Sequence, residues 1–270
     1  MTAVLTKYRH VFAIGLQNAL VYRWNFFARV LFSLLHLAAV GVLWGAIYAG
    51  RSEINGFNFS QTMSYFLGIV VANYLISAFN EDFQIGEEIR SGTINQFLTK
   101  PIDYYAYRAT LFFASRFITG VVVFIPITLL YPLLRDYVPH GTQLWCWAAA
   151  APALLLSAII QFSIAYCFGL LAFWFLEIQG FVILSLAIET LLSGQMFPLD
   201  LLAPALARIS EWLPFYYQAY FPVAIVTGRI TDHSQILEGL AIQLGWTCVL
   251  ILIGRRLWHK GLARHTAVGG

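Results

Sequence analysis

The sequence is short of charge. Only 11% of its 270 residues are Asp, Glu, Lys or Arg, whereas 60% are hydrophobic. A soluble globular domain carries about 25% charged residues, so the composition excludes an ordinary soluble domain. The net charge of +3 gives no indication of a nucleic-acid partner.

The sequence also lacks the motifs that membrane enzymes and nucleotide hydrolases use. It has no His-Glu-x-x-His, no Gly-x-Ser-x-Gly and no Gly-x-x-x-x-Gly-Lys-Ser/Thr. We therefore predict no catalytic site, no metal site and no cofactor on this chain. Cys146, Cys167 and Cys248 lie in apolar runs without ligand spacing, which is typical of small buried hydrophobes. No cleaved signal peptide is expected at the start of the chain.

What the sequence has is a series of apolar runs, each near the ~20 residues that cross a bilayer as a helix. The runs predict a polytopic all-α membrane protein with six transmembrane helices. Residues 1–270 are expected to form a single membrane domain. The predicted spans are Phe26–Ala49, Met63–Phe79, Ala109–Leu134, Leu144–Phe175, Phe181–Met196 and Leu237–Leu257.

Basic residues predict the orientation, because cytoplasmic loops are enriched in Lys and Arg. An even number of spans puts both termini on one side. Ten basic residues lie on that side: Lys7, Arg9, Arg23, Arg90, Lys100, Arg108, Arg255, Arg256, Lys260 and Arg264. Four lie on the other side: Arg51, Arg135, Arg208 and Arg229. Both termini and the loop between the second and third spans are therefore predicted to be cytoplasmic.

Residues 1–24 precede the first span and carry apolar side chains at helical spacing, among them Val4, Tyr8, Val11 and Phe12. The pattern favours an amphipathic helix lying on the cytoplasmic membrane surface. A frayed extension of the first span is the alternative.

Two ionisable residues fall inside predicted spans, Glu189 in the fifth and Arg116 in the third. A charge at membrane depth is costly and should face a polar cavity or a partner. Glu189 either lines a translocation route or pairs with Arg116 to hold the bundle, and both readings stay open. Gly41 and Gly45 form a GxxxG pattern, which ordinary helix packing explains.

The segment of residues 80–108 is the longest predicted cytoplasmic excursion, and it contains GEEIRSGTINQFLTKP. Two short apolar stripes lie among polar residues: Phe83, Ile85 and Ile89, followed by Ile94, Phe97 and Leu98. The stripes predict a short amphipathic helix that docks in a groove of another protein or lies on lipid headgroups. Periodicity does not separate these two.

Residues 197–230, between the fifth and sixth predicted spans, are too apolar for a solvated loop. Four prolines, at positions 198, 204, 214 and 222, also interrupt any straight span. We expect short helices that dip into the outer leaflet, with Trp212, Tyr216, Tyr217 and Tyr220 at the interface.

Taken together, these features resemble the permease subunit of ABC-2 type exporters. The cytoplasmic loop is similar to the family's GEIR-x-G-x-(I/L)…L-(R/K)-P pattern through Gly86, Glu87, Glu88, Ile89, Arg90, Gly92, Thr93, Ile94, Leu98 and Pro101. The outer segment is similar to the family's re-entrant helices through Gly194, Pro198, Leu199, Pro214 and Phe215. The tail from Leu257 to Gly270 resembles a branch of about 260–270 residues, often encoded as paired permeases.

The resemblance implies a coupling helix between the second and third spans that contacts separate ABC ATPase subunits, which bind ATP and Mg²⁺. It also implies a second permease, identical or a sister chain, in a bacterial cytoplasmic membrane. Arg90, Glu87 and Glu88 would make charged contacts to the ATPase. Replacing Gly92 and Ile94 with bulky charged residues is expected to uncouple ATP hydrolysis from transport.

Two other classes remain as alternatives. An ion-gradient-driven transporter or channel would act from this chain alone, but it usually needs more membrane carboxylates than Glu189. An intramembrane enzyme lacks a catalytic set here. The aromatic-rich spans suit an amphipathic, lipid-linked or polymeric substrate.

Overall fold

Helices make up the whole of the regular structure in the part of the chain that is described. The computed structural model describes residues 2–21, 23–78, 80–138 and 143–264. No strand occurs within these ranges, where extended pairing is limited to one bridge between Ile54 and Phe57. The all-α class predicted from hydropathy is confirmed.

Five helices are long and apolar enough to cross a membrane. They are α2 (Arg23–Ile47), α3 (Phe59–Ile76), α6 (Tyr104–Leu134), α7 (Leu144–Leu170) and α11 (His233–Leu262). The candidate span at α3 also runs on into the next helix, α4 (Glu81–Arg90). The five agree with five of the six predicted spans.

The predicted span Phe181–Met196 differs from the others. Its helix, α8, covers Gln179–Leu192, which at 14 residues and 1.5 Å per residue is about 21 Å long. The hydrocarbon core of a bilayer is about 30 Å thick. The helix ends because Ser193 is followed by Gly194 with φ +80°, a left-handed conformation that favours glycine.

The remaining helices are short or peripheral. α1 (Thr2–Val21) lies along the first half of α6, where Gly15 allows a close approach to Ala114. α5 (Asn95–Leu98) follows α4, and the 3₁₀ turns η1 (Arg135–Tyr137) and η2 (Leu171–Phe173) extend α6 and α7. Between α8 and α11 the chain forms η3 (Leu199–Leu201), α9 (Pro204–Glu211) and α10 (Tyr220–Val226).

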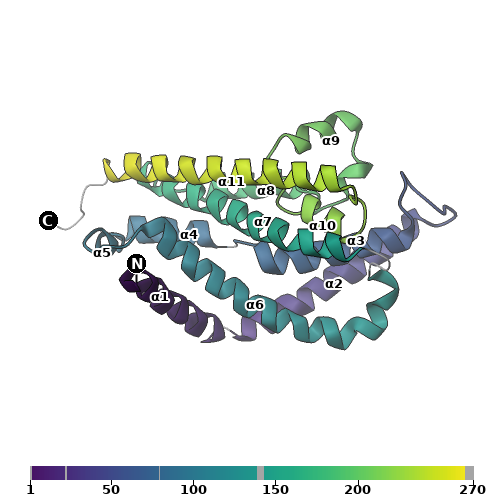
Figure 1. Ribbon diagram of the computed structural model, residues 1–270, viewed down its shortest axis with the longest axis horizontal. Helices are drawn as coiled ribbons and strands as arrows, with labels where there is room; N and C mark the ends of the chain where they lie inside the picture. The colour runs from purple at the N-terminus through teal and green to yellow at the C-terminus, as the bar shows by residue number, and fades with distance from the viewer. Residues whose placement is uncertain (1, 22, 79, 139–142, 265–270) are drawn as a thin grey trace.

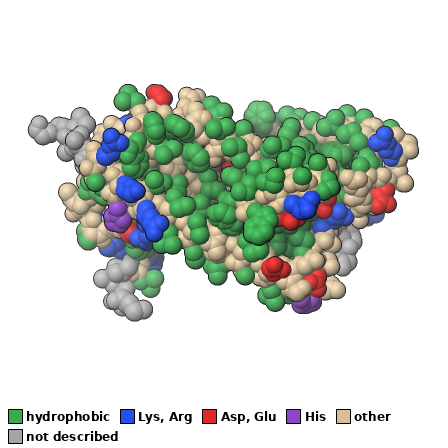
Figure 2. Space-filling model, turned by 90° about the horizontal axis from the view of Figure 1, so that it is seen from above, with side chains coloured by type: hydrophobic (Ala, Val, Ile, Leu, Met, Phe, Trp, Pro, Cys, Tyr) green, Lys and Arg blue, Asp and Glu red, His purple; other side chains and the backbone are tan. Residues whose placement is uncertain are grey.

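α1 begins and α11 ends at the same end of the elongated molecule, beside α4 and α5, and we call this the terminal end (Figure 1). α9 and the α2–α3 loop lie toward the other end. Figure 2 shows a face largely covered by hydrophobic side chains, with a group of Lys and Arg at the terminal end. Exposed Leu, Ile and Phe recur along α2, α6 and α8. These surfaces suit lipid rather than water.

The core is built around α7, which packs against α3, α4, α10 and α11. Small side chains at Ala149, Ala150 and Ala153 let neighbouring helices come close, and these residues are buried. Gln243 of α11 is fully buried and donates to the carbonyl oxygens of Ala153 (2.8 Å) and Tyr217 (2.9 Å). Polar side chains therefore join α11, α7 and the segment before α10.

Local signals set several helix ends. Asn58 caps α3 in a reciprocal capping box with Gln61, and the carboxylates of Asp103 and Asp232 accept from the first turns of α6 and α11. As a result, α6 begins five residues before the predicted span start at Ala109. Similarly, α11 begins four residues before the predicted span start at Leu237. Cys146 is buried as expected, whereas Cys248 is exposed on α11.

Candidate functional site

The predicted ATPase contact, from Gly86 to Pro101, lies in the segment formed by α4, α5 and the residues up to Pro101. We call this segment the α4–α5 loop. α4 ends at Arg90, and the backbone then reverses at Gly92, whose φ is +72°. The amide of Ile94 donates to the carbonyl of Glu88 at 2.9 Å and satisfies one of the last helix carbonyls. Because a side chain at position 92 would be strained, Gly92 is a structural requirement of the turn.

The apolar side of α4 does not face outward. Ile85 and Ile94 have no exposed surface and Ile89 is 5% exposed, and all three belong to the chain's own core. α4 packs along α7 and η2. A Cβ on Gly86 would lie 2.7 Å from Ile178, which requires a side-chain shift there. For Ile85, Ile89 and Ile94 the expectation of an anchor in a partner or on headgroups is therefore wrong, because the chain covers these side chains itself. Phe83 and Phe97 are half-buried and Leu98 is exposed.

The opposite side of the loop is open. We call its exposed residues the exposed tip. They are Glu87, Arg90, Ser91, Thr93, Gln96, Leu98, Thr99, Lys100 and Pro101. Leu98 is 46% exposed and is an apolar side chain among mostly polar ones. Arg90 is held in place by Glu87 at 3.0 Å and by the carbonyl of Leu176 at 3.0 Å.

Behind the exposed tip lies a buried ionic cluster centred on Arg108 of α6, which is 4% exposed. Its guanidinium lies 2.8 Å from a carboxylate oxygen of Glu81 and 3.1 Å from one of Glu88, both on α4. It also donates to the side-chain oxygen of Gln84 at 2.9 Å. The hydroxyl of Tyr104 donates to Glu88. Two carboxylates from one helix are thus neutralised partly by one arginine from another.

From the sequence, Arg108 is expected only as a cation of the cytoplasmic loop and Glu88 as a contact to the ATPase. A signal was present, because Glu81 and Glu88 are seven residues apart and so lie on one face of a helix. In the structure that face meets α6, and Glu88 bonds within the chain. Glu87 and Arg90 remain at the surface, as predicted.

The start of α6 is also tied to the end of α11. The ring of Tyr104 stacks on Trp258 with centroids 4.7 Å apart and planes 12° apart. Arg255 lies 3.2 Å from the carboxylate of Asp103. The α4–α5 loop, the start of α6 and the end of α11 therefore form one connected block.

Glu189 lies deeper in the helices and is 6% exposed. It accepts hydrogen bonds from the side-chain amides of Gln161 on α7 at 2.7 Å and Gln195 at 3.4 Å. Asn73 of α3 in turn donates to Gln195 at 3.3 Å. No ion pair joins Glu189 to Arg116 among the described residues, so the pairing hypothesis is wrong.

Arg116 is found elsewhere. Its guanidinium donates to the backbone carbonyl of Tyr74 at 3.4 Å and lies 5.6 Å from the centre of the Phe112 ring. It therefore sits at the junction of α3 and α6, near the side of α6 that α1 covers.

The outer segment is held by its own polar contacts. Asp200 lies 3.3 Å from Arg229 and accepts from the hydroxyl of Tyr220 at 2.7 Å. Burial, followed by the charge of Asp200, raises the pKa of Tyr220 and keeps this hydroxyl protonated. Arg229 also lies 3.7 Å above the centre of the Phe57 ring. These contacts fasten the segment to the α2–α3 loop.

The predicted residues of the outer segment are mostly internal. Gly194, Pro198, Leu199 and Pro214 are buried and Phe215 is half-buried. Tyr65 of α3 donates to the carbonyl of Gly194 at 2.8 Å. Of the aromatic residues expected at the membrane interface, Trp212 is 81% exposed, whereas Tyr217 and Tyr220 are buried, at 4% and 6%. Those two tyrosines pack in the core instead.

Within the described ranges no group of three or more His, Cys, Asp or Glu side chains is arranged to hold a metal ion.

Comparison with known protein families matches residues 34–269 to the model described as ABC-2 family transporter protein. The match begins within α2, covers the helices from α3 to α11, and includes the α4–α5 loop and the outer segment. A comparison with curated proteins found no match.

Proposed function

Because this chain belongs to the ABC-2 family of transporter proteins, we propose that it is the permease subunit of an ATP-driven exporter and forms half of the translocation pathway. In this proposal the ATPase is a separate chain, and residues 1–270 contain no P-loop motif. ATP and Mg²⁺ bind to that partner, and no reaction is catalysed here. The observation that carries the proposal is the exposed tip backed by the Arg108 cluster.

The exposed tip is suited to receive a movement from a partner. Leu98 offers a partly exposed apolar contact, and Glu87, Arg90 and Lys100 offer charged contacts around it. Displacement of the tip would act on α7 through Ile85 and Ile89, and on α6 through Arg108. The buried residues of the loop thus transmit the movement, while the exposed ones bind the ATPase.

We also propose that the chain crosses the bacterial cytoplasmic membrane six times, with both termini in the cytoplasm. In this arrangement α8 and the non-helical residues 193–198 together make the fifth crossing. α1 lies at the cytoplasmic interface, where its exposed Leu5, Ile14 and Val21 would contact lipid. The start of α1 and the end of α11 lie together at the terminal end, which supports an even number of crossings.

A second permease, identical or a sister chain, completes the pathway in this proposal. The apolar face of α8 suits that contact, because Ile183, Leu184 and Leu186 are each more than half exposed. The substrate is proposed to be amphipathic, lipid-linked or polymeric. Glu189 is assigned to the pathway as its polar group, whereas Arg116, which was also expected there, lies at the junction of α3 and α6.

Glu189 favours a second candidate, an ion-gradient-driven transporter or channel, because membrane carboxylates serve as proton and ion relays. Purification separates the two. Co-purification of an ABC ATPase supports the exporter, whereas transport by the lone chain in vesicles under an ion gradient supports the second candidate.

The coupling role is tested by Leu98→Asp. We expect the variant to fold, because Leu98 is half-exposed, and to retain less than about a tenth of the co-purified ATPase, since a lost hot-spot contact costs about 2 kcal/mol or more. The matched control is Leu144→Asp, at an 85% exposed leucine on the first turn of α7, away from the terminal end.

Ile94 is not used for this test, because a charge at a fully buried position would disturb the chain's own core. Equal ATPase retention and ATP-dependent transport by the Leu98→Asp and Leu144→Asp variants would contradict the assignment of the tip.

A further inference from the structure

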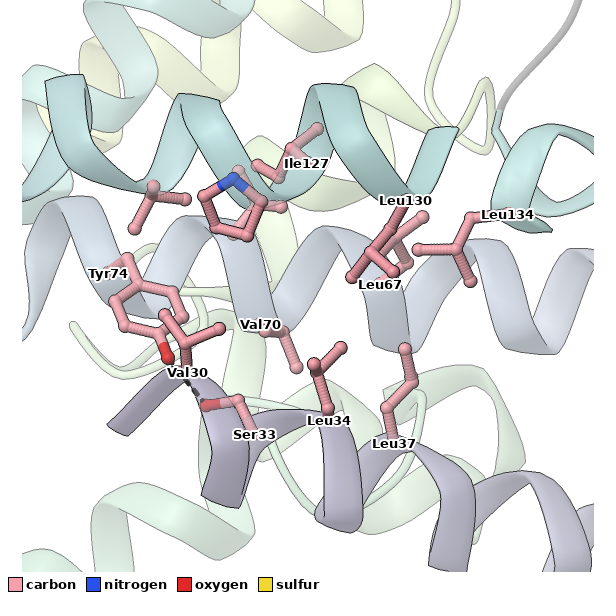
Figure 3. Close-up of a pocket in the computed structure, with 13 residues that line it drawn as sticks. Val30, Ser33, Leu34, Leu37, Leu67, Val70, Tyr74, Ile127, Leu130 and Leu134 are labelled. Carbon is pink, nitrogen blue, oxygen red and sulfur yellow. Dashed lines mark hydrogen bonds between the residues drawn. The ribbon is translucent and has the colours of Figure 1, made fainter. Parts of the chain in front are cut away.

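A groove runs between α2, α3 and α6, on the side of the molecule away from α7. Its walls are almost entirely aliphatic, and it encloses about 450 Å³ of empty space, including the part open to the outside. Figure 3 shows side chains from the three helices pointing into it. The lining is Val30, Ser33, Leu34, Leu37, Leu67, Val70, Val71, Tyr74, Val123, Pro126, Ile127, Leu130 and Leu134.

The groove has an origin in the sequence. Pro126 lies inside α6 and lines the groove, and a proline removes one backbone hydrogen bond and bends a helix away from the cyclic side chain. α2 packs loosely against the rest of the chain. Among the described side chains of Val30–Ile47, only Leu37 is buried. A bent α6 and a loosely packed α2 leave space that no side chain fills.

The polar groups of the lining are already satisfied. The hydroxyls of Ser33 and Tyr74 are 2.8 Å apart and hydrogen-bonded to each other, as the dashed line in Figure 3 marks. A polar ligand or water would therefore find few partners inside the groove. The occupant must be hydrocarbon.

The length of the groove matches a single hydrocarbon chain. From Val123 to Leu134 the groove follows α6 for about 16 Å, which is close to half of the ~30 Å hydrocarbon core. An acyl chain of one leaflet occupies about that same half of the core. One acyl chain of one leaflet therefore matches the length of the groove.

One end of the groove carries a positive charge. Tyr74 lines the groove, and its carbonyl accepts from the guanidinium of Arg116 at 3.4 Å. Arg116 lies on α6 about 10 Å before Val123, toward the terminal end of the molecule. A guanidinium at this point complements a phosphate above a chain that enters the groove.

We propose that this groove binds the acyl chain of a membrane phospholipid, with the lipid phosphate at Arg116 and the chain end at Leu134. The site rests on the proposed placement of the helices in a bilayer. It is separate from the exposed tip, and the lipid it holds belongs to the leaflet on the side of the terminal end. It fills the gap left by α2 and so fixes α2 against α3 and α6.

The test uses the full chain in phosphatidylcholine vesicles containing a trace of phosphatidylglycerol with a photoreactive diazirine on one acyl chain. Two probes are compared, one with the diazirine near the glycerol and one with it near the chain end. After irradiation, labelled residues are mapped by mass spectrometry. We expect the first probe to label Ser33 and Tyr74, and the second to label Leu130 and Leu134.

The filled-groove variant Val70→Phe/Ile127→Phe should lower labelling of Leu130 about tenfold, about 1.4 kcal/mol, relative to Leu129 in the same sample. Leu129 is 77% exposed and outside the groove, so it reports ordinary lipid contact. The matched control, Val121→Phe/Ile125→Phe, changes exposed residues of α6 outside the groove and should leave labelling unchanged.

Arg116→Gln should reduce labelling by the glycerol-proximal probe, and Arg116→Lys should restore it. These variants and the wild-type map decide the matter even if the filled-groove variant does not fold. Labelling of Leu130 no stronger than that of Leu129, or a reversed order of the two probes, would overturn the proposal. Because no ATPase is present, failure here leaves the exporter proposal intact, and failure of ATPase co-purification leaves the lipid site intact.

Discussion

Two buried charged groups in this chain are stabilised in different ways. Arg108 is surrounded by opposite charges from Glu81 and Glu88, near the terminal end. Glu189 lies deeper in the helices and is bonded by the neutral amides of Gln161 and Gln195. An ion cluster fixes a geometry firmly but depends on every member, whereas amide partners accept either a charged or a neutral group. The Arg108 cluster is therefore expected to be rigid, and the Glu189 site is expected to tolerate a change of charge.

The largest effect is expected from Arg108→Leu. The substitution leaves Glu81 and Glu88 buried without their counter-charge, and breaking a buried ion pair in this way costs about 3–5 kcal/mol. The purified variant should unfold at a clearly lower temperature in detergent than the wild type. Arg208→Leu, at an exposed arginine of α9, serves as the control and should change the unfolding temperature little. Equal unfolding temperatures for both variants would remove the structural role of the cluster.

A smaller effect is expected from Tyr104→Phe. The phenylalanine keeps the stack on Trp258 but loses the hydrogen bond to Glu88, and a hydrogen bond to a charged group contributes about 1.5–3 kcal/mol. Thermal unfolding in detergent measures the loss. Tyr131→Phe, at a half-exposed tyrosine of α6, is the matched control. A stability loss equal to that of Arg108→Leu would mean that the hydrogen bond from Tyr104 to Glu88 matters as much to the cluster as the arginine does.

The smallest effect on stability is expected from Glu189→Gln. The new side chain still presents an oxygen to Gln161, so the free energy of unfolding should change by about 1 kcal/mol or less. Transport should nevertheless fall, because the charge assigned to the pathway is gone. Normal transport by a normally folded variant would reduce Glu189 to an anchor of α8. Glu189→Leu, which leaves both amide donors unpaired, should destabilise more.

Hydropathy and capping residues are sufficient to predict most of the helices of the fold. Five long helices follow the apolar runs, because in lipid a backbone satisfies its own hydrogen bonds only as a helix or closed barrel. The end of α8 could not be predicted in the same way. The predicted span continued to Met196, yet the helix ends at Leu192 and the chain turns at Gly194. The turn is held by a hydrogen bond from Tyr65, which is 129 positions away in the sequence.

The sequence predicts where in the chain the candidate site lies, but only partly which of its side chains face the interior. The periodicity of α4 shows that Ile85 and Ile89 share a face, but it does not say what covers that face. The answer depends on Gly169 of α7, where the backbone comes so close that a Cβ would lie 2.8 Å from Ile85. Such a pairing joins segments far apart in the sequence and leaves no local signal.

The central position of α7 has a consequence for biosynthesis. The ribosome delivers α1 to α6 before α7, so the first half of the chain enters the membrane without the helix that later covers Ile85 and Ile89. The contacts already available to it are those of α6 with α1, α2 and α3, those of α2 with α3, and those of Arg108 with α4. Ile85 and Ile89 are therefore covered by α7 only after the whole first half of the chain has been made.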